Sequence, residues 1–111
     1  HWGFYAWDDN WILEMPGSVV VNGEELNEKH GYEETFFFRI IRGKPIYFAR
    51  TKDGIRINFD GQFEPYVYDL VVHNECCEPG FLNPGRSESM IWFYAFRNGQ
   101  PLYVEAGLYE E

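Results

Sequence analysis

The sequence predicts an all-β fold: a single antiparallel, meander-rich domain, either a sandwich or an open barrel of roughly seven to nine strands, with one short helix near residues 25–30. Three observations predict this class. Residues 36–62 hold three apolar runs separated by turn signals at 42–44 and 52–54. Aromatic side chains, which pack well on the pleated surface of a sheet, make up 20% of the chain. Gly preceded by Asn or Asp recurs between apolar runs, as tight hairpin turns require.

Length and charge bound what the chain can be. A chain of 111 residues has the size of one domain and can bury a useful core without disulfides or metals. Nine Lys and Arg against eighteen Asp and Glu give a net charge of −9, which disfavours binding to a nucleic-acid backbone or an anionic membrane. No apolar stretch approaches the roughly twenty residues of a membrane span, so no membrane insertion is expected. The sequence begins at His1 rather than Met, so residues 1–111 either stand alone or are a segment of a longer chain.

The first elements are predicted to be a hairpin and a third strand. Residues 2–7 and 11–15 are apolar, aromatic-rich runs on either side of the turn signal at 8–10. Residues 18–21 follow a Pro-Gly turn as a third strand. Residues 25–30 then contain good helix formers, and the Gly that follows them suits the end of a helix.

The meander at 36–62 is the largest block of uninterrupted sheet pattern. Residues 55–60 alternate between apolar and polar side chains, so this strand should be half buried. Residues 40–41 and 46–48 lack that alternation, as expected of strands covered on both faces. Residues 63–72 are partly extended, and their Pro favours an edge position.

The last third predicts a long loop and a final hairpin. Residues 73–89 hold two Pro and two Gly and break the sheet pattern. Loops of that length are uncommon and often functional. Residues 90–96 and 102–109 then flank Asn98-Gly99, a strong hairpin signal.

A weak internal repeat links three hairpins, those with turns at 8–10, 42–44 and 97–100. In the first two copies a third strand ends in Asn-Gly or Asp-Gly. The turn and aromatic positions are similar to the short Trp-Gly hairpin repeats of bacterial envelope and cytosolic proteins, which implies an array of β-hairpins. The other interpretation is that any meander of hairpins is self-similar.

His73, Cys76 and Cys77 form the most distinctive constellation, at the start of the long loop. Four interpretations stay open. The thiols are reduced and packed as small apolar groups; they form a strained vicinal disulfide; His73 and a cysteine hold a soft metal with another His; or a cysteine is a nucleophile with His73 as its base. Because the spacing of structural zinc sites is absent, no metal ligand is assigned.

Other candidate sites are weaker. The stretches at 8–10 and 58–61 resemble parts of calcium loops but lack the ligand spacing, and hairpin turns need Asp and Asn there for backbone reasons. Trp7, Trp11, Trp92 and Tyr94 lie in the first and last hairpins. If such rings point outward in a row, they make a platform for a sugar, a peptide or a partner strand; otherwise they fill the core.

The expected function is a non-catalytic binding or protein-interaction module. A carbohydrate or cell-envelope polymer is the first ligand class and a protein partner the second. The alternatives are a small thiol- or metal-dependent enzyme centred on the His73, Cys76 and Cys77 loop, and a structural repeat segment of a larger protein. No catalytic residue is assigned and no cofactor is expected, because no catalytic motif occurs. Exposed edge strands offer a route to oligomers.

Overall fold

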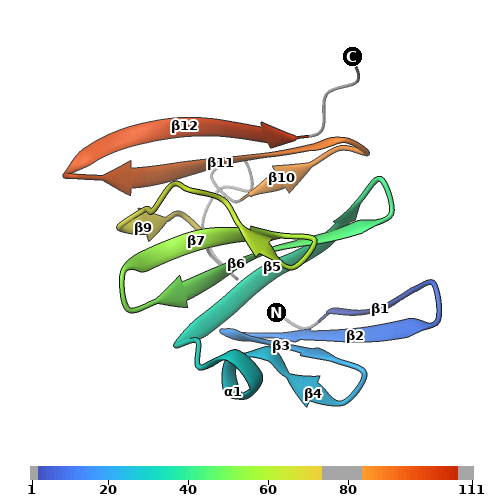
Figure 1. Ribbon diagram of the computed structural model, residues 1–111. Helices are drawn as coiled ribbons and strands as arrows, with labels where there is room; N and C mark the ends of the chain where they lie inside the picture. Colours follow the sequence, from blue (N-terminus) through green and yellow to red (C-terminus); the bar gives the residue numbers. More distant parts are fainter. Residues whose placement is uncertain (1–2, 74–83, 108–111) are drawn as a thin grey trace.

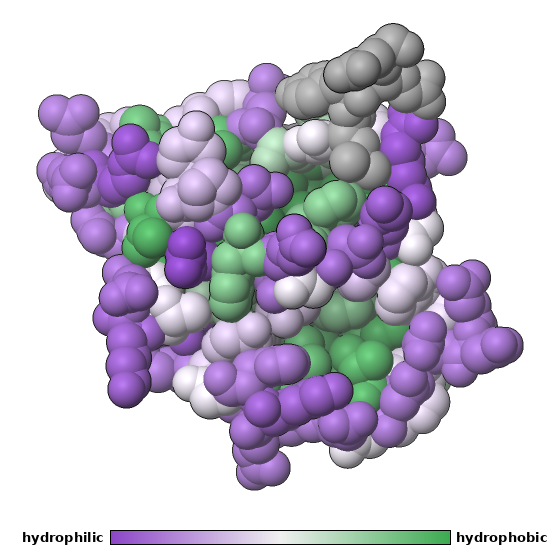
Figure 2. Space-filling view, in the orientation of Figure 1, coloured by the Kyte–Doolittle hydropathy of each residue, from purple (hydrophilic) through white to green (hydrophobic). Residues whose placement is uncertain are grey.

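The computed structural model describes residues 3–73 and 84–107, which form three antiparallel sheets of four strands each. The sheets stack as layers, with the N-terminal sheet at the bottom of Figure 1, the central sheet in the middle and the C-terminal sheet at the top. We call them sheets A, B and C in chain order. Hydrophobic side chains are visible between hydrophilic ones in Figure 2. Three layers leave two interfaces in which a core can form.

Each sheet is built from one stretch of the chain. Sheet A contains β1 (Gly3–Trp7), β2 (Asn10–Met15), β3 (Ser18–Val21) and β4 (Glu24–Glu25). Sheet B contains β5 (Glu34–Ile41), β6 (Lys44–Thr51), β7 (Gly54–Phe59) and β8 (Gln62–Phe63). Sheet C contains β9 (Leu70–Val71), β10 (Gly85–Arg86), β11 (Met90–Arg97) and β12 (Gln100–Gly107). Sheets A and B are simple meanders, whereas β11 pairs with β12 on one side and with β9 and β10 on the other.

The predicted all-β antiparallel class is confirmed, as is the short helix. Helix α1 (Leu26–His30) buries Leu26, and Gly31 ends it with a φ of 75°, a left-handed conformation that favours glycine. The eight strands of four or more residues fall in the predicted range, and the described residues add four strands of two residues each. One of these, β10, lies inside the stretch predicted as a loop at 73–89.

Sheet B is covered on both faces, which explains the missing alternation at 40–41 and 46–48. The cluster between sheets A and B contains Ile12, Val19, Leu26, Phe38, Tyr47 and Ala49. The cluster between sheets B and C contains Phe36, Ile41, Ile46, Phe48, Ile55, Ile57, Tyr68, Val71, Ile91, Phe93 and Ala95. In strand β7, Ile55 and Ile57 are buried and Arg56 is partly exposed, but Asn58 is also buried, so the predicted alternation holds only for residues 55–57.

A β-bulge in β5 sets the faces that its side chains take. The register of β5 against β6 shifts between Phe36 and Arg39, because β5 holds one extra residue there. Phe37, inside the bulge, has a φ of 55°, which a bulky side chain rarely adopts. The extra residue places Phe36 and Ile41 in the same cluster, although they are an odd number of residues apart.

Glu14 on β2 stabilises this bulge from sheet A. Its side chain is buried, and Oε1 accepts a hydrogen bond from the Phe38 backbone N–H at 2.6 Å. Arg39 Nη1 lies 3.1 and 3.3 Å from the two carboxylate oxygens. A buried carboxylate is stable only when paired and hydrogen-bonded, so sheets A and B are joined by a specific polar contact as well as by apolar packing.

Sheets A and B share one plan, in line with the repeat seen in the sequence. Each has three longer strands, a turn with positive φ at both central residues (Asn22-Gly23 and Asp60-Gly61), and a two-residue fourth strand. Those dihedral angles belong to the turn type that matches strand twist. Asn98-Gly99 makes the same kind of turn between β11 and β12. The three hairpins aligned by sequence therefore occupy one layer each.

Candidate functional site

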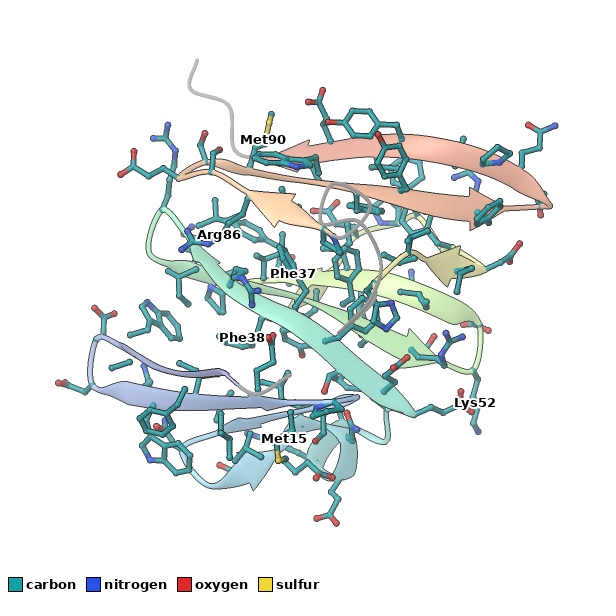
Figure 3. The ribbon with its side chains drawn as sticks, turned by 180° about the vertical axis from the view of Figure 1, so that it is seen from behind. Met15, Phe37, Phe38, Lys52, Arg86 and Met90 are labelled. Atoms are coloured by element: carbon teal, nitrogen blue, oxygen red, sulfur yellow. The ribbon has the colours of Figure 1, made fainter. Side chains whose placement is uncertain are left out.

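The outer face of sheet C carries a row of aromatic side chains. Trp92, Tyr94 and Phe96 alternate with buried residues along β11, which puts them on the face that points away from sheet B. Tyr103 of β12 lies opposite Tyr94 in the register. Met90 lies two residues before Trp92 and therefore on the same face of β11, and Figure 3 shows it projecting from the outer side of the stack. We call Trp92, Tyr94, Phe96 and Tyr103 the aromatic face.

Three of the four rings of the aromatic face are exposed, and the fourth, Trp92, is partly buried. Tyr94 and Phe96 are each 37% exposed and Tyr103 is 53% exposed. Leu70 of β9, which pairs with Phe96, is also exposed and extends the apolar surface by one strand. Contiguous exposed apolar surface commonly marks a binding site, whereas scattered exposed rings do not.

Gly85 supports the Trp92 end of the aromatic face. Gly85 pairs with Trp92 across β10 and β11, and a Cβ atom on Gly85 would collide with the indole ring. The indole therefore lies over the β10 backbone. Aromatic side chains cover glycines in this way in other sheets, and the result here is a ring laid along the sheet.

Polar groups lie beside the rings. The Tyr94 and Tyr103 rings are tilted by 50° with centroids 5.2 Å apart. The Tyr103 hydroxyl donates to Glu105 Oε2 at 3.4 Å, and Glu105 is opposite Trp92. Desolvation and the Glu105 carboxylate raise the pKa of the Tyr103 phenol, which is protonated at neutral pH even at its ordinary pKa of about 10. The surface thus combines ring faces with hydrogen-bonding groups.

Trp7 and Trp11 do not join the aromatic face. They belong to sheet A, and sheet B separates sheet A from sheet C (Figure 1). Trp7 packs against the cluster between sheets A and B, and its Nε1 donates to the Gly43 carbonyl at 3.2 Å. Trp11 is 39% exposed and stacks on Phe4 with centroids 6.0 Å apart. The four rings predicted as ligand contacts therefore divide between opposite ends of the stack.

His73 has partners within the described residues. Its ring stacks on Phe36 with centroids 3.6 Å apart. Nδ1 lies 2.7 Å from the Val71 carbonyl and Nε2 lies 3.5 Å from Glu34 Oε2, so a doubly protonated ring would donate to both. The hydrogen bond from His73 lowers the pKa of the Glu34 carboxyl; partial burial opposes this, and Arg50 at 3.4 Å adds to it. His73 thus links the segment after β9 to β5.

Cys76 and Cys77 lie outside the described residues, as does most of the loop predicted at 73–89. The hypothesis of a thiol or metal centre therefore stays a prediction. Within residues 3–73 and 84–107, no group of three or more His, Cys, Asp and Glu side chains could hold a metal ion. In the same residues, no helix is long and apolar enough to cross a membrane.

Sequence reasoning missed Phe96 and the supporting Gly85, and Tyr103 was considered as an aromatic of the last hairpin but not among the four predicted ligand contacts. The signal for Phe96 was present, because Trp92, Tyr94 and Phe96 follow each other at a strict period of two. The pairing of Gly85 with Trp92 could not be predicted, because β10 is two residues long and lies in a stretch without a sheet pattern.

Comparison of the chain with known protein families, curated proteins and solved structures finds no match.

Proposed function

We propose that this protein is a non-catalytic binding module, that the aromatic face of sheet C is its ligand surface, and that the ligand is a carbohydrate polymer. The observation that carries the proposal is the row of rings on one side of β11 and β12, of which Tyr94, Phe96 and Tyr103 are exposed. The electron-rich face of an aromatic ring attracts the positively polarised C–H groups on the apolar face of a sugar ring.

The length of the row supports a polymer over a single sugar. Side chains on one face of a strand repeat at about 6.8 Å, so Trp92 to Phe96 covers about 14 Å. The flanking Glu105 carboxylate accepts hydrogen bonds, and the hydroxyl of Tyr94 offers a donor and an acceptor for sugar hydroxyls. Several rings used at once would give a polymer an affinity that one sugar unit lacks.

Binding to a panel of immobilised polysaccharides, measured with purified protein, tests the proposal. Trp92→Ala and Tyr94→Ala should each weaken binding about five- to tenfold, the effect of losing about 1 kcal/mol of ring stacking. Trp11→Ala is the matched control, because Trp11 is also an exposed ring but lies in sheet A. Failure to bind any polysaccharide, together with capture of one specific protein, would refute the carbohydrate ligand.

A second candidate function, a stacking unit of a larger β-array, is favoured by one observation. Sheet A also exposes apolar side chains on its outer face, with Phe4 at 70% and Trp11 at 39% exposure. The two outer faces could then contact further sheets, as sheet B does on both of its sides. Self-association that Trp11→Ala and Trp92→Ala each abolish, in sedimentation experiments, would support this candidate over carbohydrate binding.

A further inference from the structure

A second surface, away from the aromatic face, lies where the open edges of the three sheets meet. Strands β1, β5 and β10 are edge strands of sheets A, B and C. Trp7 and Glu88 both form hydrogen bonds with the turn at 42–43, which holds that turn to both outer sheets. Beside it are two cavities of about 510 and 300 Å³ that share Ile40 and Arg86 in their walls. We call the two together the edge groove.

The edge groove gathers positive charge in an acidic protein. Three of the nine basic residues line it, Arg39, Arg42 and Arg86, against the carboxylates of Glu14 and Glu88. At physiological salt, charge acts over about 8 Å. A bound group therefore experiences this local set more strongly than the net charge of the chain.

Arg86 is the cation best placed for a ligand. It is exposed and forms no ion pair with any other described residue. Figure 3 shows its side chain between β10 and β5. Arg39, by contrast, already pairs with Glu14 and lies over the ring of Phe37 at 4.2 Å. A planar guanidinium with free donors suits a carboxylate bound through two parallel hydrogen bonds.

The backbone of Ile40 offers a second kind of contact. Ile41 and Lys44 flank the tight turn and form a hydrogen-bonded pair, so the next pair, Ile40 with Pro45, is not hydrogen-bonded. Pro45 instead uses its carbonyl to accept from Asp60 N–H on the other side of β6. The N–H and C=O groups of Ile40 consequently point out of the open edge of sheet B, into the edge groove.

We propose that the edge groove binds an extended acidic peptide segment, with one peptide residue paired to the backbone of Ile40 and a neighbouring carboxylate bound by Arg86. Strand addition at an open sheet edge is a known mode of peptide recognition. It is limited here to a short segment, because the Phe38 amide is taken by Glu14 and the Arg42 amide by the Glu88 carbonyl. A nucleic acid fits less well, because its charged backbone would extend beyond the groove over the rest of a chain with net charge −9.

Fluorescence anisotropy with the labelled peptide Ac-Val-Glu-Val-Glu-Val-NH2 tests the proposal, which does not depend on the aromatic face. Arg86→Ala should weaken binding about tenfold or more, as expected for the loss of a charge-assisted contact. Arg97→Ala removes the same charge from the far end of β11 and should leave affinity unchanged. A peptide with Gln in place of Glu, and one with a methylated amide at its central Val, should each bind at least about fivefold more weakly.

Three outcomes would overturn the proposal. One is the absence of saturable binding at millimolar peptide. Another is that the parent protein and the Arg86→Ala variant bind the peptide equally, or that the protein binds the Glu and Gln peptides equally. Either result would show that Arg86 does not bind a peptide carboxylate. The third is equal affinity for the methylated peptide or for an oligonucleotide of matched charge, which shows that the groove attracts anions without pairing to a peptide backbone.

Discussion

Replacing Glu14 is the sharpest test of how the strained bulge in β5 is held. In the Glu14→Ala variant the Phe38 N–H loses its acceptor in a buried position, at a cost of about 1–3 kcal/mol. Arg39 loses its counter-ion as well. Because the Arg39 side chain is 27% exposed, water replaces part of that contact, and we assign it only about 0.5–1 kcal/mol. The variant should therefore lose about 2–4 kcal/mol of unfolding free energy.

Glu14→Gln separates the two contacts. The amide oxygen still accepts from Phe38 N–H, whereas the ion pair is lost, so the expected cost is about 1 kcal/mol. Urea unfolding followed by tryptophan fluorescence measures both variants. With a slope of about 2 kcal/mol/M, Glu14→Ala should lower the midpoint by about 1–2 M. Glu24→Ala is the surface control, since Glu24 pairs with Lys29 in solvent and should change stability by less than about 0.5 kcal/mol.

Two results would refute this reasoning. If Glu14→Ala unfolds within about 0.5 kcal/mol of the parent protein, the bulge does not depend on Glu14. If Glu14→Gln is destabilised as much as Glu14→Ala, the ion pair and not the hydrogen bond to Phe38 carries the effect.

Three further predictions concern His73, Phe93 and Gly85. The His73 contact lowers the pKa of Glu34 below its ordinary value of 4.5. The contact therefore adds stability above about pH 4.5, and this stability is lost as the pH falls through the lowered pKa. Urea titrations from about pH 5 to pH 3 should show a smaller loss of stability in the His73→Ala variant than in the parent protein. Phe93→Ala removes a fully buried ring that makes edge-to-face contacts with two other rings, and it should lower the free energy of unfolding, measured in urea, by about 3–5 kcal/mol. A loss below about 1 kcal/mol would contradict the central place of Phe93 in this core. Gly85→Ala should displace the Trp92 indole, which an altered fluorescence spectrum and weaker polysaccharide binding would show; an unchanged spectrum would contradict the flat placement of the ring.

The sequence was most informative where short-range rules act. Turn dipeptides and apolar periodicity predicted the long strands, and Gly31 predicted the end of the helix, because these features depend on backbone angles of neighbouring residues. The double coverage of sheet B was also predicted, from the lack of alternation at 40–41 and 46–48. The number of layers was not, because the same strands can pack as two sheets or three.

The candidate sites show why the positions of the site residues could not be predicted from the sequence. Trp7 and Trp92 are alike as residues in aromatic strands, yet one packs against a core and the other lies on an outer face. Whether each ring is buried depends on which sheet packs against its face. That is a long-range property of the fold, and a period-two pattern does not specify it. Arg39 and Arg86 are 47 positions apart in the numbering, and they line one cavity only because two edge strands align. No feature of the sequence near either residue predicts that the two side chains lie close together.

The extra residue in β5 links stability to the proposed peptide contact. Without the bulge, the side chains after Phe37 would exchange faces, and Ile41 would leave the cluster between sheets B and C. The bulge also turns the Phe38 N–H to Glu14, so it ends the stretch of open edge that a peptide could use beside Ile40. A positive φ at Phe37, costing about 1–3 kcal/mol, persists because the surrounding contacts fix it. The tight turn at 42–43 directs the Ile40 amide and carbonyl into the edge groove, and the bulge limits the open edge to the short segment that the peptide experiment tests.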